Sequence, residues 1–84
     1  MITPTINPNG SSIDDLIAPR LDAALYLKSA IVALKQVTPN GRDYPGDADR
    51  CTADRDEHFD RLVKLRIMLE QIANEALYIK EQGQ

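Results

Sequence analysis

Cationic and aromatic side chains in this sequence have the types and spacing needed to bind an anion. Lys28 and Lys35 are seven residues apart, so on a helix they share one face, and that face lies inside an arc of apolar residues. One interpretation is that they line a pocket between helices or subunits, where cations bind an anionic small ligand and tyrosine rings stack on a base. The candidate residues of this ligand site are Lys28, Lys35, Arg42, Tyr44, Tyr26 and Arg66.

A second interpretation gives the same lysines a structural role only. Their alkyl stems then pack over a partner helix while the ammonium groups reach water, or they pair with acidic side chains of another subunit. The two interpretations differ in what the cations face, which is a shared cavity in the first and acidic residues of a neighbouring helix in the second. Replacement of Lys28 and Lys35 with alanine tests the ligand site, because it is expected to abolish binding of the anionic ligand.

Asp54 and His58 come closest to a metal-binding pattern. They are four residues apart on one helical face, and Cys51 and Glu57, which are also possible zinc ligands, lie nearby. His58 is the only histidine, however, and no second well-spaced pair of ligands follows. We therefore predict no metal site and expect the imidazole of His58 to be hydrogen-bonded to a neighbouring carboxylate.

The sequence carries no recognisable catalytic motif. The acidic segment 47–54 lacks the central glycine and the terminal glutamate of an EF-hand calcium loop. We find no glycine-rich phosphate loop, no nucleophile elbow and no cysteine–histidine pair on a familiar scaffold. We therefore predict a protein that is not an enzyme and that uses no cofactor.

Length, charge and hydropathy narrow the class of protein further. A chain of 84 residues forms one small domain with a small core, and such domains are commonly stabilised by oligomerisation. The net charge of −3 makes nucleic acid an unexpected partner, and the apolar runs are too short to span a bilayer. Because Cys51 is the only cysteine and no signal-peptide pattern is present, we expect a cytoplasmic protein.

An apolar stripe in the second half of the chain predicts the element that positions these residues. Its members step by four and three residues in alternation, which is the heptad pattern of a helix that packs on another helix. They are His58, Leu62, Leu65, Leu69, Ile72, Ala76 and Ile79. We predict one long helix over 53–81, with Thr52 as its N-cap.

The first half of the chain is predicted to form two helical pieces. Ser12 is a good N-cap, and it is followed by two aspartates that complement the helix dipole. Pro19 lacks an N–H donor and clashes with the preceding turn. We therefore predict a short helix over 12–18, a break or kink at Pro19, and a main helix over 19–37.

Two segments without helical periodicity complete the chain. Residues 1–11 contain two prolines and an Asn-Gly pair, which predicts a flexible N-terminal arm. The connection over 38–52 is long for a helical hairpin, and Pro45 and Gly46 within it suit the central positions of a type II turn. The remaining residues, 12–82, are predicted to form a single helical-hairpin domain.

Together these elements predict an all-α fold, an antiparallel helical hairpin with a short N-terminal helix that assembles as an oligomeric helical bundle. The second helix would be about 45 Å long and the helix over 19–37 about 28 Å. Since the shorter helix cannot cover the longer one, we predict a homo-oligomer with helices paired antiparallel. In the alternative, the short helix before Pro19 folds over the exposed end and seals a monomer.

A short first helix pair, the Asn40-Gly41-Arg42 connection and the Leu- and Glu-rich run over 64–76 resemble a known protein family. The chain is similar, over residues 20–80, to the phage-encoded helical-hairpin proteins that sequester cyclic-nucleotide immune signals, the anti-CBASS sponges. The resemblance implies an oligomer with nucleotide pockets at subunit interfaces. It also implies no cofactor, no turnover and, for a viral protein, a location in the host cytoplasm.

Two classes of function follow from the sequence. The first is a small-ligand binding protein, most specifically a viral anti-defence protein that captures a cyclic nucleotide between helices. The second is a protein-interaction module, such as a host-protein inhibitor, an antitoxin-like partner or a virion assembly component, in which the apolar helical faces are the active surface.

Overall fold

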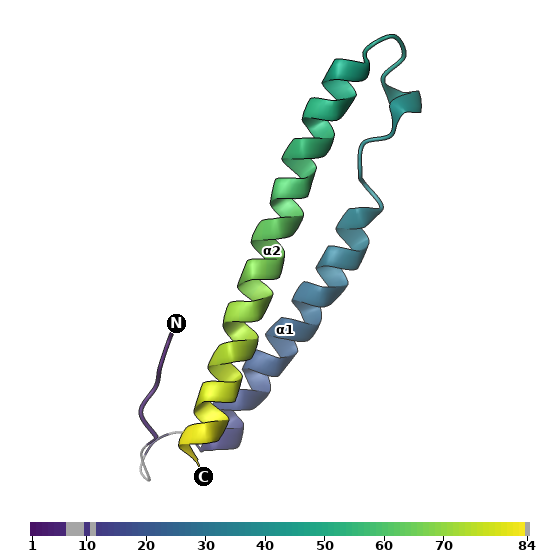
Figure 1. Cartoon of the computed structure of the whole chain (residues 1–84). Coiled ribbons are helices and arrows are strands. Elements are labelled where there is room, and N and C mark those ends of the chain that lie inside the picture. Colours follow the sequence, from purple (N-terminus) through teal and green to yellow (C-terminus); the bar gives the residue numbers. More distant parts are fainter. Residues whose placement is uncertain (7–9, 11, 84) are drawn as a thin grey trace.

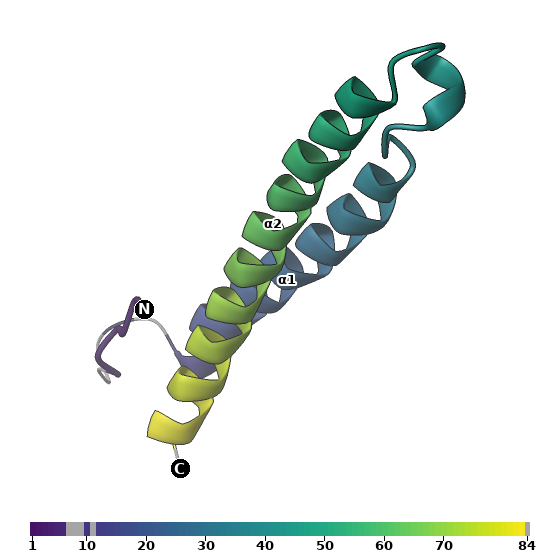
Figure 2. The same ribbon diagram turned by 45° about the horizontal axis from the view of Figure 1, so that its top comes forward.

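A computed structural model describes residues 1–6, 10 and 12–83 as a two-helix hairpin. Helix α1 spans Ile13–Lys35, helix α2 spans Ala48–Gln82, and a 3-10 helix, η1, spans Gly41–Asp43 between them. The two long helices run antiparallel and lie side by side in both ribbon views (Figures 1 and 2). The described residues contain no strand, so the predicted all-α helical hairpin is confirmed. Assembly into an oligomer stays a prediction.

Helix α1 is continuous through Pro19, so the predicted division into helices over 12–18 and 19–37 is wrong. Pro19 has no N–H to offer the carbonyl of Asp15, but both residues are exposed, so that carbonyl lies on the solvent side of the helix. In the same turn the guanidinium of Arg20 donates a hydrogen bond to the carbonyl of Leu16 over 2.9 Å. The predicted N-cap at Ser12 is confirmed, because its hydroxyl accepts from the Asp15 amide.

Helix α2 begins five residues earlier than the predicted position 53, and Thr52 is not its N-cap. The cap is Asp47, whose carboxylate accepts from the amide of Arg50 over 3.1 Å. Thr52 lies inside the helix and donates its hydroxyl to the carbonyl of Ala48, one turn back. Aspartate and threonine are both good caps in isolation, and the turn that precedes Asp47 decides between them.

That turn has the predicted type II geometry. The amide of Asp47 donates to the carbonyl of Tyr44 over 3.0 Å, and Gly46 has a φ of 75°. A residue with a side chain would be strained at this position, whereas glycine is not. The turn directs the chain into α2 at Ala48, and the connection therefore spans 36–47 rather than 38–52.

The connection covers the part of α2 that extends past α1. Helix α2 is about 52 Å long and α1 about 35 Å, so the mismatch in length is real. However, the connection folds back on the extra turns, because Arg55 donates to the carbonyl of Pro39 over 2.8 Å and Tyr44 donates to Asp54 over 2.6 Å. Cys51 is only 5% exposed beneath it. The difference in helix length is therefore partly covered by the chain's own connection, and the homo-oligomer that was inferred from it stays a prediction.

The apolar stripe of α2 faces α1 along its whole length, and we call it the seam. Three of its members, His58, Ala76 and Ile79, are buried, and the other four are half-buried. On α1 the residues that face the seam include buried Ala24 and Ile31. Two helices enclose few residues completely, so much of the apolar surface of this chain stays accessible.

The N-terminal arm lies along the C-terminal half of α2 (Figure 1). The amide of Ile2 donates to a carboxylate oxygen of Glu75 over 3.0 Å. The predicted flexible arm over 1–11 therefore contacts α2 through residues 1–6, which was not expected. Residues 7–9 and 11 of this arm lie outside the described residues. Neither long helix in the described part of the chain is long and apolar enough to cross a membrane.

Candidate functional site

The two flanks of the seam differ, and each forms one face of the hairpin. Each α2 residue that directly follows a seam residue points to one side of the hairpin. The α1 residues that directly follow its interface residues point to the same side, because successive residues are 100° apart and this rotation has opposite senses in two antiparallel helices. We call this side the groove face. On α2 it consists of Phe59, Val63, Arg66, Glu70, Ala73 and Leu77, and on α1 of Leu21, Leu25, Lys28 and Val32.

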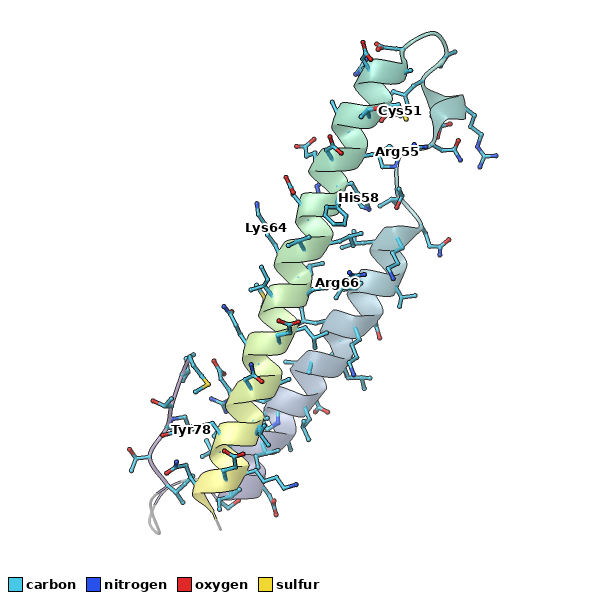
Figure 3. All side chains as sticks on the ribbon, in the orientation of Figure 1. Cys51, Arg55, His58, Lys64, Arg66 and Tyr78 are labelled. Carbon is cyan, nitrogen blue, oxygen red and sulfur yellow. The ribbon has the colours of Figure 1, made fainter. Side chains whose placement is uncertain are left out.

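The opposite side is the arm face, which contains the α2 residues one position before the seam. It includes Met68, Gln71, Glu75 and Tyr78, and the arm contacts it at Glu75. Figure 3 shows Tyr78 on the side of α2 where the arm lies, and Arg66 between α2 and α1. Within the described residues, the arm therefore contacts the arm face and leaves the groove face open.

Three open hollows follow one another along the groove face, between α1 and α2. The central hollow, of about 460 Å³, is lined by Lys28, Ile31, Val32, Arg66, Leu69 and Glu70. The hollow nearer the connection has a volume of about 280 Å³ and is lined by Thr38, Arg55, Asp56, His58, Phe59 and Leu62. The hollow nearer the chain ends has a volume of about 250 Å³ and is lined by Ile17, Leu21, Ala73, Ala76, Leu77 and Lys80.

Large apolar residues line each of these hollows, and several of them are accessible. Five groove-face side chains are between 53% and 62% exposed, namely Leu21, Leu25, Val32, Phe59 and Leu77. A row of such residues along one face of a small protein is typical of a surface that binds another molecule. The groove face is therefore the candidate functional site.

The structure brings two of the six predicted ligand residues together. Lys28 of α1 and Arg66 of α2 line the central hollow, with Glu70 beside them. Lys35 lies on the same flank of α1, two turns beyond Lys28. Arg42 lies in η1, and Tyr26 is on the other flank of α1, where it is 71% exposed. One chain by itself thus brings together the two cations Lys28 and Arg66 with the carboxylate of Glu70. It does not bring all six predicted ligand residues into one pocket.

Tyr44, the sixth predicted ligand residue, belongs to a polar hollow at the connection. This hollow is about 400 Å³ in volume, and Asp43, Asp47, Arg50 and Asp54 line it with Tyr44 and Pro45. The hydrogen bond that Tyr44 donates to Asp54 raises the pKa of the phenol above its usual value near 10, and the negative charge of Asp54 acts in the same direction. The hydroxyl of Tyr44 is thus engaged in holding the connection to α2.

Sequence reasoning missed the contact between Arg20 and Glu75. The guanidinium Nε of Arg20 lies 3.4 Å from a carboxylate oxygen of Glu75, which is only 8% exposed and also accepts from the Ile2 amide. Glu75 thus joins α1, α2 and the arm. A sequence signal did exist, since a glutamate directly before a seam residue faces the edge of the interface, but its partner in α1 is 55 positions away.

His58 pairs with a backbone carbonyl rather than with the expected carboxylate. It is 3% exposed, and its Nε2 lies 2.8 Å from the carbonyl oxygen of Leu34 at the end of α1. Because a carbonyl only accepts, Nε2 carries the proton in this contact. Among the described residues, no group of three histidine, cysteine, aspartate or glutamate side chains is arranged to hold a metal ion.

No protein-family model, curated protein or solved structure matches this chain. The inference of function therefore depends on the groove face, the central cations and the contacts that hold the hairpin.

Proposed function

We propose that this chain is a non-enzymatic binding module that recognises another helical protein surface through its groove face. The observation that carries the proposal is the row of three hollows on one face, bordered by apolar residues that are more than half exposed. An amphipathic partner helix can lay the apolar side chains of one face into such a row of hollows, with anchors that recur at positions i, i+3, i+4 and i+7 along its length.

The distribution of polar groups supports a binding role over a catalytic one. The hollow nearer the chain ends is lined mainly by apolar side chains, and Phe59 and Leu62 contribute apolar surface to the hollow nearer the connection. The charged residues of the central hollow, Lys28, Arg66 and Glu70, then set the register and orientation of the partner, because unpaired charges at a buried interface are costly.

Site-specific photo-crosslinking in cells that express the full chain tests this proposal. A photoreactive phenylalanine analogue at position 59 lies on the groove face, and the same analogue at position 68 lies on the arm face as the matched control. We expect a discrete protein adduct from position 59 and none from position 68. Adducts from position 68 alone, or from neither position, would overturn the proposal.

A second candidate function is the capture of an anionic small ligand such as a cyclic nucleotide, as implied by the resemblance to anti-CBASS sponges. The observation in its favour is that Lys28 and Arg66 line the same hollow. Glu70 opposes an anion there, so a second chain or a nucleotide base that pairs with the carboxylate is needed. Native mass spectrometry with cyclic dinucleotides tests it, with Lys28→Ala expected to lose the bound mass and Lys64→Ala, outside the groove face, expected to retain it.

A further inference from the structure

We propose that the partner of the groove face is a second copy of this chain, packed antiparallel so that α2 lies on α2 and α1 on α1. This inference rests on the proposed binding function and names its partner. Three observations carry it: the order of side chains along α2, the order along α1, and the agreement between the two.

The groove-face stripe of α2 is complementary to itself when it is reversed. Its six residues are symmetric in position about residue 68. An antiparallel copy therefore places Phe59 on Leu77 of the second copy, Val63 on Ala73 of the second copy, and Arg66 on Glu70 of the second copy. The two-fold axis repeats each pair, so apolar contacts lie at both ends and two Arg–Glu pairs lie in the centre.

The charges at the centre are available for these pairs. Both Arg66 and Glu70 line the central hollow. Among the described residues the structure has one ion pair, Arg20 with Glu75, so Arg66 and Glu70 are not bridged within the chain. An arginine and a carboxylate from opposite chains form a charge-assisted hydrogen bond that also fixes the register.

The α1 stripe independently gives the same axis. Reversal about a point between residues 26 and 27 places Leu21 on Val32 of the second copy, and Leu25 against the alkyl stem of Lys28 of the second copy. Within the hairpin, Lys28 shares a hollow with Arg66, and Arg20 contacts Glu75, so residue 68 of α2 lies level with residues 26 and 27 of α1. One two-fold axis therefore serves both helices.

The size of the face is adequate for a specific interface. The overlap of the helices is about 35 Å long and the molecule is 18 Å across, which gives a flat footprint of about 600 Å². The ridges of a helical surface increase this toward the roughly 800 Å² per partner of a standard interface. The dimer would be a four-helix bundle with the arm on its outside.

Two complementary charge variants test the register. Alone, Arg66→Glu places four carboxylates at the centre of the dimer and Glu70→Arg places four guanidiniums, so we expect each to weaken dimerisation on the order of tenfold or more. An equimolar mixture pairs glutamates of one chain with arginines of the other. Native mass spectrometry should then show the 1:1 heterodimer as the main dimer. An ion pair between residues 66 and 70 of the same helix could not produce this preference.

Sedimentation of Leu77→Asp and Met68→Asp tests which face forms the dimer, independently of the register of the two copies. Leu77→Asp, on the groove face, is expected to weaken the dimer by about 100-fold or more, and Met68→Asp, on the arm face, to leave it unchanged. Circular dichroism confirms that both variants remain helical.

The possible failures are distinguishable. A wild-type dimer that Leu77→Asp disrupts, but whose charge variants form no heterodimer, would overturn the register and leave the groove face as the binding surface. A chain that is monomeric at concentrations of hundreds of micromolar would overturn the second copy as the partner. In that case a position-59 adduct with a different protein retains the proposed function, and no adduct removes it.

Discussion

The two faces of this hairpin flank the same seam, yet the described part of the chain covers only one of them. On the arm face the arm contacts Glu75, and near the other end Tyr44 of the connection lies beside Glu57 and Arg61. The groove face has apolar residues at the equivalent positions, and three hollows remain open along it.

This difference shows how a two-helix protein separates folding from binding. The seam and the contacts of the arm face join distant parts of one chain, so they act at any protein concentration. Exposed leucines and a phenylalanine on the groove face contribute little until another surface removes them from water. Substitutions on the two faces should therefore be distinguished by whether their effects depend on concentration.

The largest effect is expected in the seam, on which both faces depend. Ile79 is fully buried, so Ile79→Ala removes buried methyl groups and leaves a cavity, at a cost of about 2–5 kcal/mol in the free energy of unfolding. Ile67→Ala is the matched control, because Ile67 is 49% exposed on the same helix. Urea unfolding at several protein concentrations measures both. Equal losses for the two variants would contradict the described packing of α2.

A smaller effect should distinguish the faces directly through two glutamates of α2. Glu75→Ala removes the acceptor for Arg20 and for the Ile2 amide, and we expect it to lower the free energy of unfolding by about 1–3 kcal/mol at every protein concentration. Glu70→Ala removes a carboxylate from the groove face, so its effect should vanish on dilution to the monomer.

A double-mutant cycle with Arg20→Ala isolates the contact between Arg20 and Glu75. The coupling free energy is expected to be about 0.5–1.5 kcal/mol, since the guanidinium is partly exposed and also bonds to the Leu16 carbonyl. A coupling of zero, or a Glu75→Ala loss that disappears on dilution, would show that the arm face also depends on association.

The sequence alone predicted the hairpin and its seam, because a heptad stripe is a local pattern and it determines which face of its own helix is apolar. The Ser12 cap and the turn at Pro45 and Gly46 were predictable for the same reason. The start of α2 was not, since Asp47 and Thr52 are both good caps and their choice depends on the turn before them.

Contacts between residues far apart in the sequence could not be predicted from local patterns. Sequence rules predict a break or kink at Pro19, but they do not include the packing of α1 against α2 that accompanies the continuous helix. In the same way, the distance between Arg20 and Glu75 depends on the register of the hairpin. The candidate site was predicted in part, because Lys28 lies within the apolar arc of α1 that the sequence shows. The residues of α2 that lie near Lys28 are defined only by the fold.

The smallest predicted effect concerns the connection, which closes the arm face at the end opposite the arm. The hydrogen bond to Asp54 raises the pKa of the Tyr44 phenol, so the folded state holds this proton more tightly than the unfolded state. The stabilisation is fully present below the unfolded pKa near 10 and is lost as the pH rises through the higher folded pKa. Wild type should therefore lose stability relative to Tyr44→Phe only in the alkaline range.

Difference titration of phenolate absorbance, wild type minus Tyr44→Phe, isolates this one tyrosine from the others. We expect Asp54→Ala to lower the Tyr44 pKa toward its usual value, because it removes the hydrogen-bond acceptor and, with it, the negative charge that opposes ionisation. A Tyr44 pKa that is the same with and without Asp54 would mean that the connection is not held to α2 by this bond. The connection would then be held to α2 by the contact between Arg55 and Pro39, and the arm face would be covered by the arm.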